Sequence, residues 1–176
     1  MNVSDDLPVT RRAPTFASRS VNARLAAGLR AAERWLGGTG IKSQDVRAFL
    51  DHLWARPTIT PETFDLWHAY DSDVQRAAAG GELPRSVVDE CIAHQIDPSE
   101  LHGLLMNVAE IVEGNLFARV NDAETLWHLQ EIEDVASQHG IQLPSARSFS
   151  DQPFADQHGW GNRVDSVELA RWRQLT

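Results

Sequence analysis

Apolar residues recur at intervals of three and four along nearly the whole chain, which is the spacing of one face of an α-helix. The clearest example follows residues 97–100 (Asp-Pro-Ser-Glu), which combine a helix N-cap, a proline at the first helical position and a capping-box glutamate. The period-two alternation of a half-buried strand is nearly absent. The sequence therefore predicts an all-α protein. The apolar face after residue 100 consists of Leu101, Leu104, Leu105, Val108, Ile111 and Val112.

Glycines and prolines divide this pattern into a bundle of about six to seven helices. The chain of 176 residues is long enough for a single core. We expect a flexible N-terminal arm over residues 1–19, which contains two prolines, and a single helical domain over residues 20–176. An irregular, aromatic-containing segment should precede the short last helix. The expected helices cover roughly residues 20–36, 43–56, 61–79, 84–93, 98–113, 122–139 and 166–175.

Composition excludes several classes of protein. Hydrophobic residues make up 42% of the chain and charged residues 23%, as in an ordinary globular domain. No run of apolar residues is long enough to span a bilayer, and no apolar stretch follows the first arginines as it would in a secretory signal. Cys91 is the only cysteine, so no disulfide can form within the chain. We expect a cytoplasmic protein without a cofactor.

Negative charge is concentrated in one region. Between Asp97 and Asp134 there are nine acidic residues and a single basic one, Arg119, in a chain of net charge −9. The two helices expected there should turn these carboxylates, and His128, away from their apolar faces. Such a surface repels nucleic acid and attracts a basic protein. The residues predicted to meet a basic partner protein on this surface are Glu110, Glu113, Glu124 and Glu131, with Trp127 beside them.

Signals for catalysis are weak. The chain lacks the HExxH, GxSxG, GxxxxGK[ST] and GxGxxG motifs. The spacings Glu110-x-x-Glu113 and His128-x-x-Glu131 suit a helix, but a di-metal centre needs Glu-x-x-His facing inward, so no metal site is predicted.

The segment QPFADQHGWGNRVD, residues 152–165, carries the remaining chemistry. A hydrolytic group of Asp156, His158 and either Ser148 or Ser150 is one alternative, although only the residue types support it, and a metal-dependent enzyme that uses His158 and the neighbouring aspartates is its variant. In the same segment Trp160 lies between two glycines, which allow unusual backbone angles. We favour a segment that is stapled onto the bundle by its aromatic residues over one that contacts a partner. Asp156, His158 and Trp160 remain secondary candidates for partner binding.

The run EIVEGNLFARVNDAETLWHLQEIEDVASQHGIQLP, together with the later SDQPFADQHGWGNRVD, resembles the C-terminal part of small helical immunity proteins encoded beside bacterial polymorphic toxins. The resemblance covers about residues 100–163 and lies in the pattern of residues. It implies a bacterial cytoplasmic protein without chemistry of its own, which binds a toxin domain and blocks the toxin's active site. A helical regulatory module with another basic partner is a further alternative.

Overall fold

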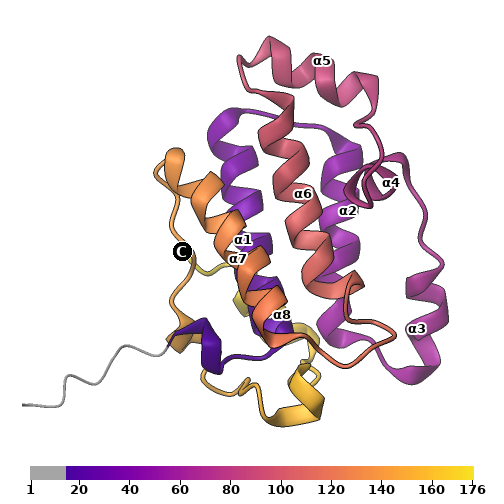
Figure 1. Cartoon of the computed structure of the whole chain (residues 1–176), viewed down its shortest axis with the longest axis vertical. Coiled ribbons are helices and arrows are strands. Elements are labelled where there is room, and N and C mark those ends of the chain that lie inside the picture. Colours follow the sequence, from indigo (N-terminus) through magenta and orange to yellow (C-terminus); the bar gives the residue numbers. More distant parts are fainter. Residues whose placement is uncertain (1–14) are drawn as a thin grey trace, which may run out of the picture.

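The computed structural model describes residues 15–176, which form eight α-helices joined by turns and short 3₁₀ helices (Figure 1). The predicted all-α bundle is confirmed. The first fourteen residues, most of the predicted arm, lie outside the described residues. Among the described residues, no helix has both the length and the apolarity that crossing a bilayer requires. The α-helices are α1 Val21–Thr39, α2 Gln44–Ala55, α3 Pro61–His68, α4 Asp73–Ala78, α5 Arg85–Ala93, α6 Pro98–Glu113, α7 Asp122–Gln138 and α8 Ser166–Trp172.

Helix α1 is the centre of the core. Thirteen of its nineteen residues are buried, and it packs against α2, α6 and α7 (Figure 1). The contact with α7 is close at Gly28, where an added Cβ would lie 3.0 Å from Cδ1 of Ile132. A small residue is therefore needed at this crossing. In Figure 1, α5 crosses one end of the bundle, and the irregular C-terminal chain wraps the opposite end.

The expected helix starts are found where a side chain caps the backbone. The side chains of Ser20, Ser43, Asp97 and Asn121 each accept a hydrogen bond from a backbone N–H in the first turn of α1, α2, α6 and α7. The single helix predicted over residues 61–79 is wrong, because α3 ends at His68 and α4 begins at Asp73. The reason is a new cap: the Ser72 hydroxyl accepts a hydrogen bond from the backbone of Gln75 at 3.0 Å.

The irregular segment closes around the start of α1, as the stapling prediction required. Backbone hydrogen bonds run from Ser20 N to Gln152 O, from Phe154 N to Ser18 O and from Asn22 N to the carbonyl of Trp160. Phe149, before it, is fully buried. The glycines on either side of the tryptophan have φ angles of 98° and 82°, in the range that favours glycine. Residues 15–19 also belong to the folded body through a short 3₁₀ helix and an isolated bridge to residue 153.

One arginine ties these parts together. The Arg24 side chain, fully buried on α1, donates to the backbone carbonyls of Phe16, Ala17 and Asp122 at 3.1–3.2 Å. It also donates to the hydroxyl of Thr125 at 2.5 Å and to the Asp122 carboxylate at 2.6 Å. The chain before α1 and the first turn of α7 are thereby fixed to α1 through one side chain.

Candidate functional site

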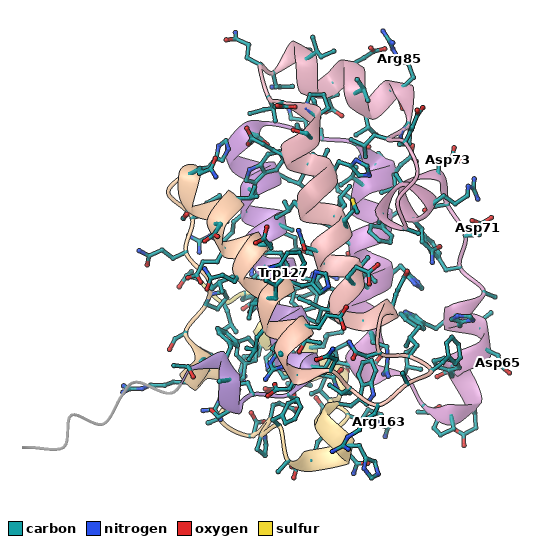
Figure 2. The ribbon with its side chains drawn as sticks, in the orientation of Figure 1. Asp65, Asp71, Asp73, Arg85, Trp127 and Arg163 are labelled. Atoms are coloured by element: carbon teal, nitrogen blue, oxygen red, sulfur yellow. The ribbon has the colours of Figure 1, made fainter. Side chains whose placement is uncertain are left out.

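Trp127 lies on the outer side of α7 with 56% of its surface exposed (Figure 2). Glu124 is one turn before it and Glu131 one turn after it, while Glu110 lies on α6. None of these three carboxylates forms an ion pair with another residue of the described chain 15–176. We call Glu110, Glu113, Glu124 and Glu131 the acidic strip. An exposed tryptophan beside carboxylates that lack a cationic partner combines the aromatic and charged groups that protein interfaces use as anchors.

His128 was expected on the outer side of α7, and that prediction is wrong. The side chain is only 8% exposed, in the seam between α6 and α7, and its Nδ1 lies 2.8 Å from the Oδ1 of Asn107. The Asn107 amide in turn donates to the carbonyl of Gly103 at 2.8 Å. The hydrogen bond to Asn107 allows the ring to enter the seam. Burial lowers the pKa of His128 despite the nearby carboxylates, so the ring is neutral and does not balance their charge.

Glu113 also departs from its expected place, because it is partly buried instead of standing outward. Its carboxylate accepts a hydrogen bond from the Gln75 side chain of α4 at 3.4 Å. Burial raises the pKa of Glu113, and the neighbouring Glu110 acts in the same direction. The carboxylate lines a hollow of about 220 Å³ at the end of α6. The acidic strip therefore extends from the solvent-exposed face of α7 to a recess beside α4.

Aromatic rings form the walls of this recess. His52 of α2 is stacked between Trp67 and Tyr70, with ring centroids 4.7 and 4.1 Å away. Burial lowers the pKa of His52 to about 4, so the imidazole is neutral at neutral pH. Phe117, which is 78% exposed, lies at the recess with its ring edge-on to that of His68.

Two acceptors of the recess come from α4 and α6. The Gln75 Oε1 atom is buried without a hydrogen-bond partner, and the Glu113 carboxylate lies beside it. Aromatic faces and free acceptors together suit a group that carries positive charge and several donors, such as a primary ammonium. The sequence contains no direct signal for this stack, because His52 lies on α2 whereas Trp67 lies on α3 and Tyr70 just after it.

The irregular segment does not assemble a hydrolytic group. The Asp156 carboxylate accepts a hydrogen bond from the Asn162 side chain at 2.8 Å. His158 is exposed and has a φ angle of 58°, in the left-handed region. No hydrogen bond joins Asp156, His158, Ser148 or Ser150 to one another through their side chains. Trp160, by contrast, is partly buried beneath Arg56, whose guanidinium carbon is 4.2 Å from the ring centroid.

The described side chains offer no metal site. Within residues 15–176, no cluster of three or more His, Cys, Asp or Glu side chains is arranged to hold a metal ion.

Comparisons with models of protein families, with curated proteins and with solved structures found no match to this chain. Function is therefore inferred from the residues of the acidic strip, the recess and the irregular segment themselves.

Proposed function

We propose that this chain is a non-catalytic binding protein of the immunity type, which neutralises a toxin domain by covering its basic active site with the acidic strip. The observation that carries the proposal is the exposure of Trp127 between Glu124 and Glu131, neither of which has a cationic partner in the described chain. Binding energy at protein interfaces is concentrated in such aromatic anchors. The surrounding carboxylates would supply the charge complementarity.

The electrostatic part of the argument concerns the free protein. The ring of His128 stays neutral because burial lowers its pKa. The negative charges of Glu110, Glu124 and Glu131 each act in the opposite direction, which shows that all three lie near this ring. Like charges gathered in this way repel one another, and a cationic surface relieves the repulsion on binding. The same field speeds the encounter with a basic partner and weakens as salt is added.

The recess at Glu113 would extend this contact. A lysine side chain of the partner would place its methylene groups against Phe117 and Trp67, and its ammonium at the Glu113 carboxylate and the Gln75 carbonyl oxygen. Such a cation would satisfy an acceptor that is buried without a donor. It would also stabilise the charged form of a carboxyl group whose pKa burial raises.

Co-expression tests the proposal. The chain is produced in cells together with a toxin domain encoded beside its gene, and growth is compared with that of cells producing the toxin alone. The wild-type chain should restore growth, and the double variant Glu124→Lys and Glu131→Lys should not. The control is Glu82→Lys with Asp151→Lys, which makes the same charge change at exposed positions away from the strip. Equal protection by both double variants would exclude the strip.

Loss of protection must also be distinguished from loss of fold. Circular dichroism and thermal unfolding of the purified variants serve that purpose, since Glu131 is half-buried, whereas substitutions at exposed positions such as Glu124 change the free energy of unfolding by only about 0.5 kcal/mol. A regulatory module with another basic partner would use the same surface without protecting cells. In that case a partner co-purifies with the wild type and the control but not with the strip variant, while growth is not restored.

A further inference from the structure

A second hollow, of about 560 Å³, opens at the end of the bundle where the irregular segment wraps α1. It lies between the first turn of α1, the turn after α2, the start of α3 and residues 157–163. No residue of the acidic strip lines it. The polar and aromatic residues that matter here are Asn22, Arg56, Thr60, Glu62, Trp160 and Arg163.

Arg56 contributes an uncompensated positive charge. Its guanidinium group lies against Trp160, with Trp67 at 5.8 Å on another side, and it forms no ion pair within residues 15–176. The Nε atom is buried without an acceptor. Burial lowers the pKa of Arg56, although an arginine stays protonated at any physiological pH. Arg56 is half-buried and its Nε atom is fully buried, and a cation held partly out of water without a counter-charge is costly, so an anion at this position would stabilise the protein.

Asn22 contributes a hydrogen-bond acceptor that has no donor. It is only 3% exposed and lines the hollow, and its Oδ1 atom is buried without a donor. Its backbone N–H is already used by the carbonyl of Trp160. The hollow thus contains a donor without an acceptor and an acceptor without a donor. A group that fills it must both accept and donate hydrogen bonds.

The surroundings also favour negative charge. Arg163 is a second, exposed cation of the hollow, and Glu62 is the single carboxylate among the lining residues. Two helices begin here: Asn22 is the second residue of α1, and Glu62 is the second residue of α3. The N-terminal end of a helix carries partial positive charge, which favours anions, although the N–H groups of Asn22 and Ala23 are already bonded to the Trp160 carbonyl and the Ser20 hydroxyl.

We propose that this hollow binds the phosphate group of a phosphomonoester. The phosphate oxygens would accept hydrogen bonds from Arg56 and Arg163, and the hydroxyl of the monoprotonated phosphate would donate to the Oδ1 of Asn22. A carboxylate or a sulfate satisfies the arginines but has no proton to give to that oxygen. The second pKa of a phosphomonoester is about 6, so the monoprotonated form is accessible near neutral pH. The indole of Trp160 shields one face of the Arg56 guanidinium from solvent.

Titration calorimetry with inorganic phosphate tests the site on the full chain. The wild type should bind at millimolar concentration and should bind sulfate more weakly. Arg56→Met should weaken phosphate binding by at least about tenfold, because it removes a charge-assisted bond. Arg163→Gln changes only an exposed side chain, leaves the fold intact and should weaken binding by about threefold. The control is Arg85→Met on α5, at the opposite end of the molecule (Figure 2), which should leave binding unchanged.

Asn22→Asp is the sharpest variant. It keeps the size of the side chain but adds a negative charge that repels the phosphate and competes for Arg56, so it should abolish binding. Absence of phosphate binding by the wild type at millimolar concentration overturns the proposal, as does unchanged binding by Arg56→Met. Equal affinity for sulfate overturns the assignment to phosphate. Titration with ribose 5-phosphate and with a neutral phosphoserine peptide then identifies the source of the group: the tighter ligand shows whether it comes from a metabolite or from a protein.

Discussion

The Nη2 atom of Arg24 lies 2.6 Å from the Oδ1 of Asp122, so that the centre of the core is bonded to the first residue of α7. The arginine side chain is completely buried, whereas the aspartate side chain is 49% exposed. The other guanidinium N–H groups are used by backbone carbonyls and by Thr125. The arginine therefore determines where α7 begins relative to α1, and with it the position of Trp127.

Replacing this arginine should destabilise the fold severely. Arg24→Met leaves three backbone carbonyls and a hydroxyl without their donor, and we expect the free energy of unfolding to fall by about 3–5 kcal/mol. Asp122→Asn keeps the buried cation and its carbonyl partners, and its loss should be about 1 kcal/mol because that carboxylate is half exposed to solvent. Urea denaturation at pH 7 measures the free energy of unfolding of both variants. Similar losses for the two variants would contradict a central role for the arginine.

The stability of the protein should fall as the pH is lowered from about 6.5 to about 4, partly because of His52. In this window the unfolded chain binds a proton at this histidine and the folded chain does not, so acid favours unfolding. Above pH 6.5 both states are neutral there and the contribution is complete. Its size should be on the order of 2 kcal/mol, allowing for partial solvent screening. The lowered pKa of His128 acts in the same direction, and the raised pKa of Glu113 acts in the opposite one.

His52→Phe isolates this contribution. Phenylalanine preserves the stack with Trp67 and Tyr70 but cannot take up a proton. Chemical denaturation between pH 4 and pH 7 should therefore show a shallower loss of stability for the variant than for the wild type. Identical pH profiles would mean that the ring is not held neutral by the fold.

Gly161→Ala should be among the most damaging single substitutions. Its φ angle is 82°, and an added Cβ would lie 2.3 Å from the Ser20 hydroxyl and 2.4 Å from the Gln152 side chain. The expected loss is about 3 kcal/mol or more, from crowding added to backbone strain. Gly140→Ala is the matched control, because its φ is 72° with nothing within 4 Å, so only the backbone term of about 1–2 kcal/mol applies. Equal melting temperatures for the two variants would rule out the crowding.

Trp127→Ala should separate binding from stability. Because the indole is mostly exposed, its removal should change the free energy of unfolding by no more than about 0.5 kcal/mol. On the proposed function, affinity for a cognate toxin domain should fall by about 2 kcal/mol or more. Val167→Ala on α8 provides a control at an exposed apolar side chain outside the strip. Calorimetric titration compares all three proteins; a loss shared by both variants would argue against an anchor at Trp127.

Local signals in the sequence were enough to predict most of the helices. The caps at Ser20, Asp97 and Asn121 place the starts of three helices because a cap needs only its own next few residues. The division between α3 and α4 escaped notice because one serine hydroxyl, at position 72, competes with an otherwise continuous helical pattern. The clasping of the irregular segment was foreseen from its aromatic residues and flanking glycines.

The candidate sites depend on contacts between residues far apart in the chain. His128 enters the helix seam because Asn107, on another helix, offers it a hydrogen bond. The recess beside Glu113 requires rings from α2 and α3, whose placement no local pattern specifies. The left-handed angle of Gln157 is likewise imposed by the closure of the segment, since glutamine seldom adopts a positive φ.

The burial of α1 has a consequence for biosynthesis. Within this chain, the helix is translated before the parts that cover it, which belong to α6, α7 and the segment near residue 160. Until those parts have emerged, the nascent chain carries an apolar helix with no cover, the kind of intermediate that chaperones bind. Such distant pairings also slow the search for the native state. The helix is thus covered only after α7 and the segment near residue 160 have been made, and chains truncated before α7 should aggregate.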